Sequence, residues 1–81
     1  MAEEHTFDST VDITDVECPV TFIKAKVSLD EMEVGQVLRI HMNGGKPLRN
    51  VPRSFLEDGQ QLVALDENDD GTYELYVRRI Q

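Results

Sequence analysis

The sequence predicts a two-layer α/β sandwich, in which two helices cover one face of a mixed four-stranded sheet and the elements follow the order β-α-β-α-β-β. Three observations support this fold class. Four segments have strand character, one segment repeats apolar residues every three or four positions, and a polar turn separates the last two strand segments. Because consecutive elements tend to lie side by side, this order gives a single mixed sheet most economically.

The first half of the chain predicts a strand, a helix and a second strand. Residues 6–13 alternate well enough for a short strand, and residues 36–42, which follow Gly35, alternate as a half-buried strand does. Between them, residues 19–32 have apolar side chains along one helical face, which we expect to pack on the sheet. The side chains on this face are Phe22, Ala25, Leu29 and Met32. On the second strand, one side consists of Leu38, Ile40 and Met42.

The second half predicts a loop, a short helix and a hairpin. Residues 43–47 include two glycines and Pro47, which favour a loop. The short helix is expected to begin near Pro52 and to end at Gly59, a residue type typical of helix C-termini. Residues 60–66 and 72–80 then predict two antiparallel strands, joined by a polar turn at residues 68–71.

Length and charge limit the functions open to the chain. Its 81 residues make one domain, residues 1–81, with a thin core and an N-terminus that we expect to be frayed over residues 1–6. The formal net charge of −8 disfavours direct contact with nucleic acid or an anionic membrane. It favours protein partners with basic docking faces, and we expect a monomer.

Location and metal binding are constrained in the same way. No apolar run is long enough to span a bilayer, and the acidic N-terminus does not resemble a secretory signal, so we expect a cytoplasmic protein. The single cysteine excludes an intramolecular disulfide and fits a reducing compartment. Together with His5 and His41 it lacks the spacing of a zinc site, so we expect no metal.

That cysteine, Cys18, is followed by Pro19 at the expected start of the first helix. Proline suits the first helical position, and a cysteine at a helix N-terminus meets free N–H groups and the positive end of the macrodipole. Both favour the reactive thiolate. The preceding carboxylates, Asp12, Asp15 and Glu17, would raise the pKa of the thiol if they faced it, and the sequence does not decide which effect dominates.

Three segments together resemble the TusA/SirA family of small sulfur-carrier proteins. Residues 12–21 read Asp-Ile-Thr-Asp-Val-Glu-Cys-Pro-Val-Thr, residues 33–38 read Glu-Val-Gly-Gln-Val-Leu, and residues 49–52 read Arg-Asn-Val-Pro. The resemblance extends from about residue 10 to residue 80. It implies the same two-layer sandwich, with Cys18 carrying sulfur as a persulfide and no other cofactor. It also implies two protein partners, a donor such as a cysteine desulfurase or a rhodanese-type protein, and an acceptor.

The chain departs from the family pattern at two positions. Thr21 replaces the second proline of the motif Cys-Pro-x-Pro, and Asp15 replaces a glycine usual three residues before the cysteine. Thr21 fits an early helical turn, where its hydroxyl can bond a backbone group or a persulfide. The loss of the second proline concerns the partner or pathway more than the sulfur chemistry.

Three functions therefore remain open. The first is a sulfurtransferase-type carrier in a sulfur relay, which transfers persulfide sulfur through Cys18 without being an independent catalyst, because no histidine is spaced to act as its base. The second is a regulatory or interaction module of the same fold that transfers no sulfur. The third is a thiol redox sensor, in which Cys18 forms a sulfenic acid or an intermolecular disulfide.

Two further groups are candidates for partner binding. Val20, Ile23 and Val27 form a second apolar stripe on the first helix, which either packs against the second helix or is partly exposed as a docking patch. Lys46 and Arg49 flank the loop before the second helix. They are either ordinary surface charges or contacts for an acidic partner or a persulfide.

Overall fold

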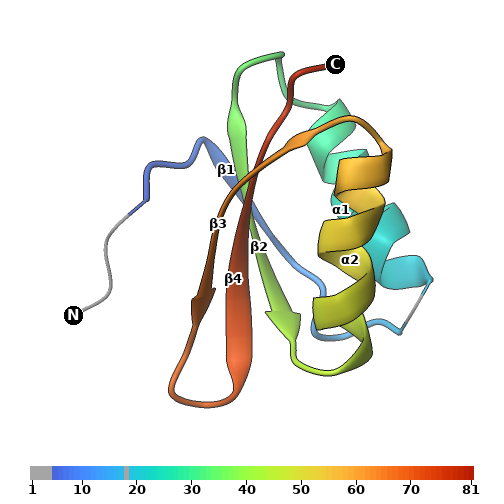
Figure 1. The fold of residues 1–81 in the computed structure, drawn as a ribbon, viewed down its shortest axis with the longest axis vertical. Helices are drawn as coiled ribbons and strands as arrows, with labels where there is room; N and C mark the ends of the chain where they lie inside the picture. Colours follow the sequence, from blue (N-terminus) through green and yellow to red (C-terminus); the bar gives the residue numbers. More distant parts are fainter. Residues whose placement is uncertain (1–4, 18) are drawn as a thin grey trace.

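The computed structural model describes residues 5–17 and 19–81, and it confirms the predicted two-layer α/β sandwich. Four strands form one mixed sheet, and both helices lie on the same face of it (Figure 1). The elements in chain order are β1 (Ser9–Asp12), α1 (Val20–Asp30), β2 (Val37–Asn43), α2 (Lys46–Glu57), β3 (Gln61–Glu67) and β4 (Thr72–Arg78).

The strands lie in the order β1-β2-β4-β3, which places β2 and β4 at the centre of the sheet. β1 pairs with β2 in parallel, and α1 is the crossover between them. β4 pairs antiparallel with both β2 and β3. The connection between β3 and β4 is therefore the hairpin that the polar turn predicts.

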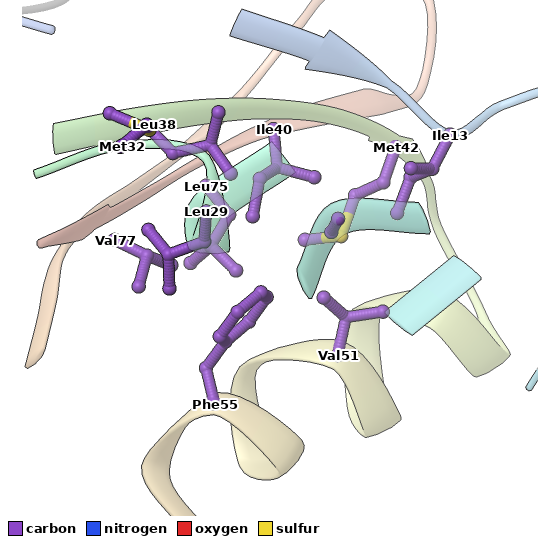
Figure 2. Close-up of a cluster of buried hydrophobic side chains, with 11 residues drawn as sticks. Ile13, Leu29, Met32, Leu38, Ile40, Met42, Val51, Phe55, Leu75 and Val77 are labelled. Carbon is purple, nitrogen blue, oxygen red and sulfur yellow. The ribbon is translucent and has the colours of Figure 1, made fainter. Parts of the chain in front are cut away.

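The core lies between the helices and the central strands (Figure 2). Side chains from α2, such as Val51 and Phe55, face the inner side of the sheet, and the Phe22 ring meets the Phe55 ring edge to face at 4.9 Å between centroids. The buried cluster consists of Ile13, Ala25, Leu29, Met32, Leu38, Ile40, Met42, Val51, Phe55, Leu75 and Val77. The predicted inner face of the first helix and the predicted inner side of the second strand are thus confirmed.

Several element boundaries differ from the expected ones, and β2, β3 and the end of β4 are shifted by only one or two residues. β1 occupies only Ser9–Asp12 within the expected residues 6–13, and α1 ends at Asp30, two residues before Met32. The prediction that the second helix begins near Pro52 is wrong, because α2 begins at Lys46. Pro47 lies in the first turn, where its missing N–H removes no helical hydrogen bond. Pro52 lies inside the helix, where it removes one backbone bond without ending the helix.

Among the described residues, no helix covers the other face of the sheet, and the chain before β1 contacts that face. The His5 ring lies 4.8 Å from the Tyr76 ring, and His5 Nε2 lies 3.3 Å from Asp66 Oδ2. The Arg39 guanidinium lies over the Phe7 ring at 4.4 Å from its centroid. Residues 1–4 of the segment that we expect to be frayed lie outside the described residues.

An ion-pair cluster joins the two helices at the C-terminal end of α2. Lys26 Nζ lies 2.6 Å from Asp58 Oδ2 and 3.0 Å from Asp30 Oδ1. The hydrogen bond to Asp58 raises the pKa of Lys26 above its ordinary value. The Lys26 ammonium, with a second hydrogen bond from Gln60, lowers the pKa of the Asp58 carboxyl. Each partner therefore stabilises the charged form of the other.

Replacing Asp58 by asparagine is expected to lower the free energy of unfolding by about 1 kcal/mol at neutral pH, because the charge of Lys26 loses its closest partner. A carboxyl whose pKa is lowered on folding contributes stability above its ordinary value, here 3.8, and loses that contribution as the pH falls through the folded value. The difference between wild type and variant should therefore shrink at about pH 2.5. Urea unfolding at both pH values measures it. Asp69→Asn, in the exposed turn after β3, is the matched control, and a difference that stayed constant with pH would contradict the prediction.

Candidate functional site

The candidate site lies around the loop between β1 and α1, which contains the Cys18-Pro19 pair. Cys18 itself lies outside the described residues, so the predicted thiolate and its opposing carboxylates are not placed relative to each other. Its neighbours in the chain are placed. Pro19 is the N-cap of α1, one position earlier than expected, and the backbone N–H groups of Val20 and Thr21 donate to the Glu17 carbonyl at 2.8 and 3.3 Å. The backbone on both sides of Cys18 is thus held by the first turn of the helix.

Two hollows border these neighbours. The first, called here the α1–α2 groove, has a volume of about 370 Å³. It is lined by Pro19, Thr21, Phe22, Ile23, Asn50, Arg53, Ser54 and Glu57. The second, called the Lys46 hollow, also measures about 370 Å³. It is lined by Val16, Glu17, Asn43, Gly44, Lys46 and Pro47. The residue before Cys18 therefore lines one hollow, and the residue after it lines the other.

The apolar stripe on α1 is exposed to solvent. Val20, Ile23 and Val27 have relative exposures of 47%, 55% and 53%. α2 meets α1 along a different stripe, through the Phe22 ring and the Lys26 ammonium. Of the two interpretations that the sequence leaves open, the structure therefore favours the exposed patch.

Thr21 lies at the inner side of the same helix turn and is fully buried, in contrast to its exposed neighbours Pro19 and Val20. It is the position at which the family pattern has its second proline. Thr21 also lines the α1–α2 groove, so it borders the site on the side that faces the core. Its contact with a persulfide stays a prediction.

Two of the three carboxylates before Cys18 have partners of their own. Asp12 accepts hydrogen bonds from the Thr14 hydroxyl and backbone N–H, at 2.6 and 2.8 Å, and these bonds lower the pKa of the Asp12 carboxyl. Asp15 Oδ1 lies 2.9 Å from Lys24 Nζ. Both side chains are exposed at this pair, so the attraction is weak, but it offsets part of the negative charge of the loop.

The histidines lie on the helix-free face of the sheet. His5 contacts Asp66 and Tyr76 there, and His41 Nδ1 lies 2.6 Å from Glu74 Oε1. Neither histidine lines either hollow. Among residues 5–17 and 19–81, no group of three or more His, Cys, Asp or Glu side chains is arranged to hold a metal ion.

Lys46 and Arg49, both predicted as candidates for partner binding, lie on α2 and are exposed. The structure adds Arg53, which sequence analysis missed. The three cations are spaced i, i+3 and i+7, so they share one face of α2. This spacing is visible in the sequence only if the helix begins at Lys46, and the expected start near Pro52 concealed it.

Fold and site together define a class of protein: a small α/β sandwich with one cysteine in the loop that leads into its first helix. A solved structure of a SirA-like protein from Desulfitobacterium hafniense has the same fold, with a TM-score of 0.78 and 25% identity over 91% of this chain and 100% of that one. A proposed sulfur carrier protein of Archaeoglobus fulgidus is 28% identical over 72 residues, which cover 89% of this chain and 82% of the relative.

The model of the family described as sulfurtransferase TusA matches residues 9–79. The chain belongs to this family, as the resemblance in its sequence implies. Membership supports a role in carrying sulfur. In the part of the chain that the structure describes, no helix combines the length and the apolar character needed to cross a membrane.

Proposed function

We propose that the protein is a sulfur carrier that accepts sulfur on Cys18 as a persulfide from a donor protein and passes it to an acceptor protein. One observation carries this proposal: the family match extends over residues 9–79 and so includes the Cys18-Pro19 pair, and Cys18 is the only cysteine in the chain. A protein with a single cysteine can carry one sulfur atom and cannot release it by forming an internal disulfide.

The chemistry consists of two thiolate attacks. The Cys18 thiolate attacks the outer sulfur of a cysteine persulfide on the donor, the donor's S–S bond breaks, and the donor cysteine leaves as a thiolate. Cys18 then carries the persulfide. In the second step the acceptor's thiolate attacks the outer sulfur of the Cys18 persulfide. The S–S bond at Cys18 breaks, and Cys18 leaves as a thiolate. Each step exchanges one S–S bond for another, so no external oxidant or reductant is consumed.

The architecture of the site supports a role as a carrier. Glu17 and Pro19, the chain neighbours of Cys18, line two open hollows, which suits access by large partners. Attack by a thiolate on a persulfide requires no separate base, and His5 and His41 lie away from both hollows. The exposed stripe of α1 offers apolar area for partner contact.

Partners and location follow from the same proposal. The donor is a cysteine desulfurase or a rhodanese-type protein, and the acceptor serves thiolation of tRNA or of a cofactor, or the oxidation of inorganic sulfur compounds. We place the relay in the cytoplasm, with the carrier acting as a monomer that holds no cofactor except its covalent sulfur. Because the net charge is −8, tRNA is handled by a partner enzyme rather than by this chain.

The test is the intact mass of the protein after exposure to a sulfur source. Purified, reduced protein is incubated with inorganic polysulfide and, separately, with a cysteine desulfurase and cysteine. We expect the mass of one additional sulfur atom, which peptide mapping locates at Cys18 and which a thiol reductant removes. Absence of this gain with every source, while Cys18 still reacts with an alkylating reagent, would contradict the proposal.

A charge in the exposed stripe is expected to slow transfer from a protein donor. Ile23 is 55% exposed and lines the α1–α2 groove, so Ile23→Asp should leave the fold intact and place a charge where a partner packs. If the charge weakens the free energy of docking by about 1.4 kcal/mol, the second-order rate of sulfur transfer from the donor falls about ten-fold. Loading from polysulfide should be unchanged. Val34→Asp, at a residue exposed on the turn after α1, is the control, and equal rates for the two variants would show that the stripe takes no part in docking.

A further inference from the structure

The cations of α2 form no ion pair with a carboxylate among the described residues. Arg78 and Arg79 also form none there, but their guanidinium groups donate hydrogen bonds to Gln61 Oε1 and to backbone carbonyls, respectively. Within the described residues, Lys24, Lys26 and Arg39 each form an ion pair with a carboxylate. No ion pair in that part of the chain involves Lys46, Arg49 or Arg53, which we call the α2 cation row. All three members are exposed on one helix face. Their charges are therefore available to another molecule.

The cation row runs along the candidate site. Lys46 lines the hollow that contains Glu17, and Arg53 lines the groove that contains Pro19. Arg49 lies between them on the helix. Glu17 and Pro19 flank Cys18 in the chain, so a partner that contacts both of them approaches the two hollows that Lys46 and Arg53 line.

Negative charge near the row is present but smaller. Glu17 lies in the Lys46 hollow and Glu57 in the α1–α2 groove, and neither is within ion-pair distance of a cation of the row. Asp15, the other carboxylate of the loop described after β1, is paired with Lys24. The three cations of the row thus exceed the two unpaired carboxylates beside them.

This local charge is opposite to that of the whole chain. The net charge of −8 favours partners with basic docking faces, as sequence analysis expected. Exposed charges are screened beyond about 8 Å at physiological ionic strength, so a docked partner responds mainly to the charges that it contacts. At the candidate site those charges belong to the cation row and not to the acidic remainder of the surface.

Resting on the proposed carrier function, we infer that the α2 cation row binds carboxylate side chains of the partner segment that presents the sulfur-bearing cysteine to Cys18. The segment is acidic, and it carries an apolar side chain that packs on Phe22 and Ile23 in the α1–α2 groove. Arginine binds carboxylates through two parallel hydrogen bonds, so Arg49 and Arg53 orient the segment as well as attract it. The partner of this acidic protein is therefore acidic at the contact.

Two synthetic peptides test the inference without any natural partner. They share one cysteine and one leucine and differ only in flanking residues, which are glutamates in one and lysines in the other. Each cysteine is activated as a mixed disulfide with a chromogenic thiol. The Cys18 thiolate attacks the peptide sulfur, the chromogenic thiolate leaves, and its absorbance gives the second-order rate. Rates are divided by the rate with neutral dipyridyl disulfide, which corrects for the intrinsic reactivity of Cys18.

We expect the glutamate peptide to react about ten-fold faster at an ionic strength of about 0.15 M, where charges beyond the contact are screened, and the preference to fall as more salt is added. Arg53→Glu should remove most of this preference. Arg78→Glu makes the same charge change on an exposed residue at the end of β4, and should leave it in place. Circular dichroism of each variant confirms its fold.

Other outcomes overturn the inference. A faster reaction of the lysine peptide would mean that the overall charge of the chain governs docking. An unchanged preference for the glutamate peptide in Arg53→Glu would mean that the cation row does not bind the acidic segment. No reaction of Cys18 with either peptide would show that no partner cysteine can reach the sulfur beside the row. Failure of the carrier function is distinguishable, because it would appear as absent loading from polysulfide while the charge preference of the disulfide reaction persisted.

Discussion

Replacing Cys18 by serine is expected to abolish sulfur loading from every source. A serine hydroxyl is not ionised at neutral pH and forms no stable bond to sulfane sulfur, whereas a thiolate both attacks and carries it. The chain contains no other cysteine that could take over. The intact mass of Cys18→Ser after incubation with polysulfide should therefore equal that of the untreated variant, while wild type gains one sulfur atom. Circular dichroism and urea unfolding of both proteins check that the fold is unchanged.

The same variant separates the three functions that the sequence leaves open. For a carrier, Cys18→Ser loses both loading and biological activity. For an interaction module, it keeps full biological activity, because the sulfur is not used. For a redox sensor, wild type responds to peroxide at Cys18 without accepting sulfur, and the variant loses that response. A gain of sulfur by Cys18→Ser would contradict the assignment of the carrier residue altogether.

Much of the fold was predictable because its signals are periodic over many residues. The alternation of Leu38, Ile40 and Met42 indicates the inner face of β2, and the spacing of Ala25 and Leu29 indicates the inner face of α1. The hairpin of β3 and β4 follows from its polar turn. These features depend on local sequence and on burial. They are sufficient to predict the order of helices and strands along the chain and the two layers of the sandwich.

The beginning of α2 was not predictable from the same kind of signal. Two glycines and Pro47 are typical of a loop, but a proline is equally suited to the first turn of a helix, and Gly45 at φ 84° supplies the turn into it. Local residue preferences do not distinguish the two cases. The error affected the site as well, because the α2 cation row shares one helix face only when Lys46 belongs to the helix.

The environment of the site depends on packing that the sequence leaves undetermined. Whether the stripe containing Ile23 is exposed depends on which side of α1 meets α2, and the contacts of Phe22 and Lys26 with α2 settle this. The contact of His5 with Asp66 likewise joins the segment before β1 to β3, the strand at the opposite edge of the sheet. Such contacts are set by tertiary packing, and no local pattern indicates them.

Replacing Phe55 by alanine is expected to destabilise the protein by about 3–5 kcal/mol. The Phe55 side chain is fully buried and points toward the core residues of the sheet (Figure 2). Its ring also contacts the Phe22 ring, which joins α2 to α1. Truncation to alanine removes the transfer free energy of the ring and leaves a cavity that the sheet cannot collapse to fill. A domain of 81 residues has a total stability of about 4–12 kcal/mol, so the variant should lose about a quarter of that stability or more.

The neighbouring residue provides a matched control. Leu56 is 57% exposed on the outer side of α2, so Leu56→Ala removes apolar atoms from the same helix turn without opening a cavity, and it should cost less than about 1 kcal/mol. Urea unfolding of both variants, followed by circular dichroism, gives the two midpoint concentrations. They are compared with the same dependence of the free energy of unfolding on urea concentration. Because Phe55 also holds α2 against α1, its loss should weaken docking at the α1–α2 groove even in the molecules that remain folded. Similar midpoints for the two variants would mean that Phe55 does not anchor α2 to the sheet.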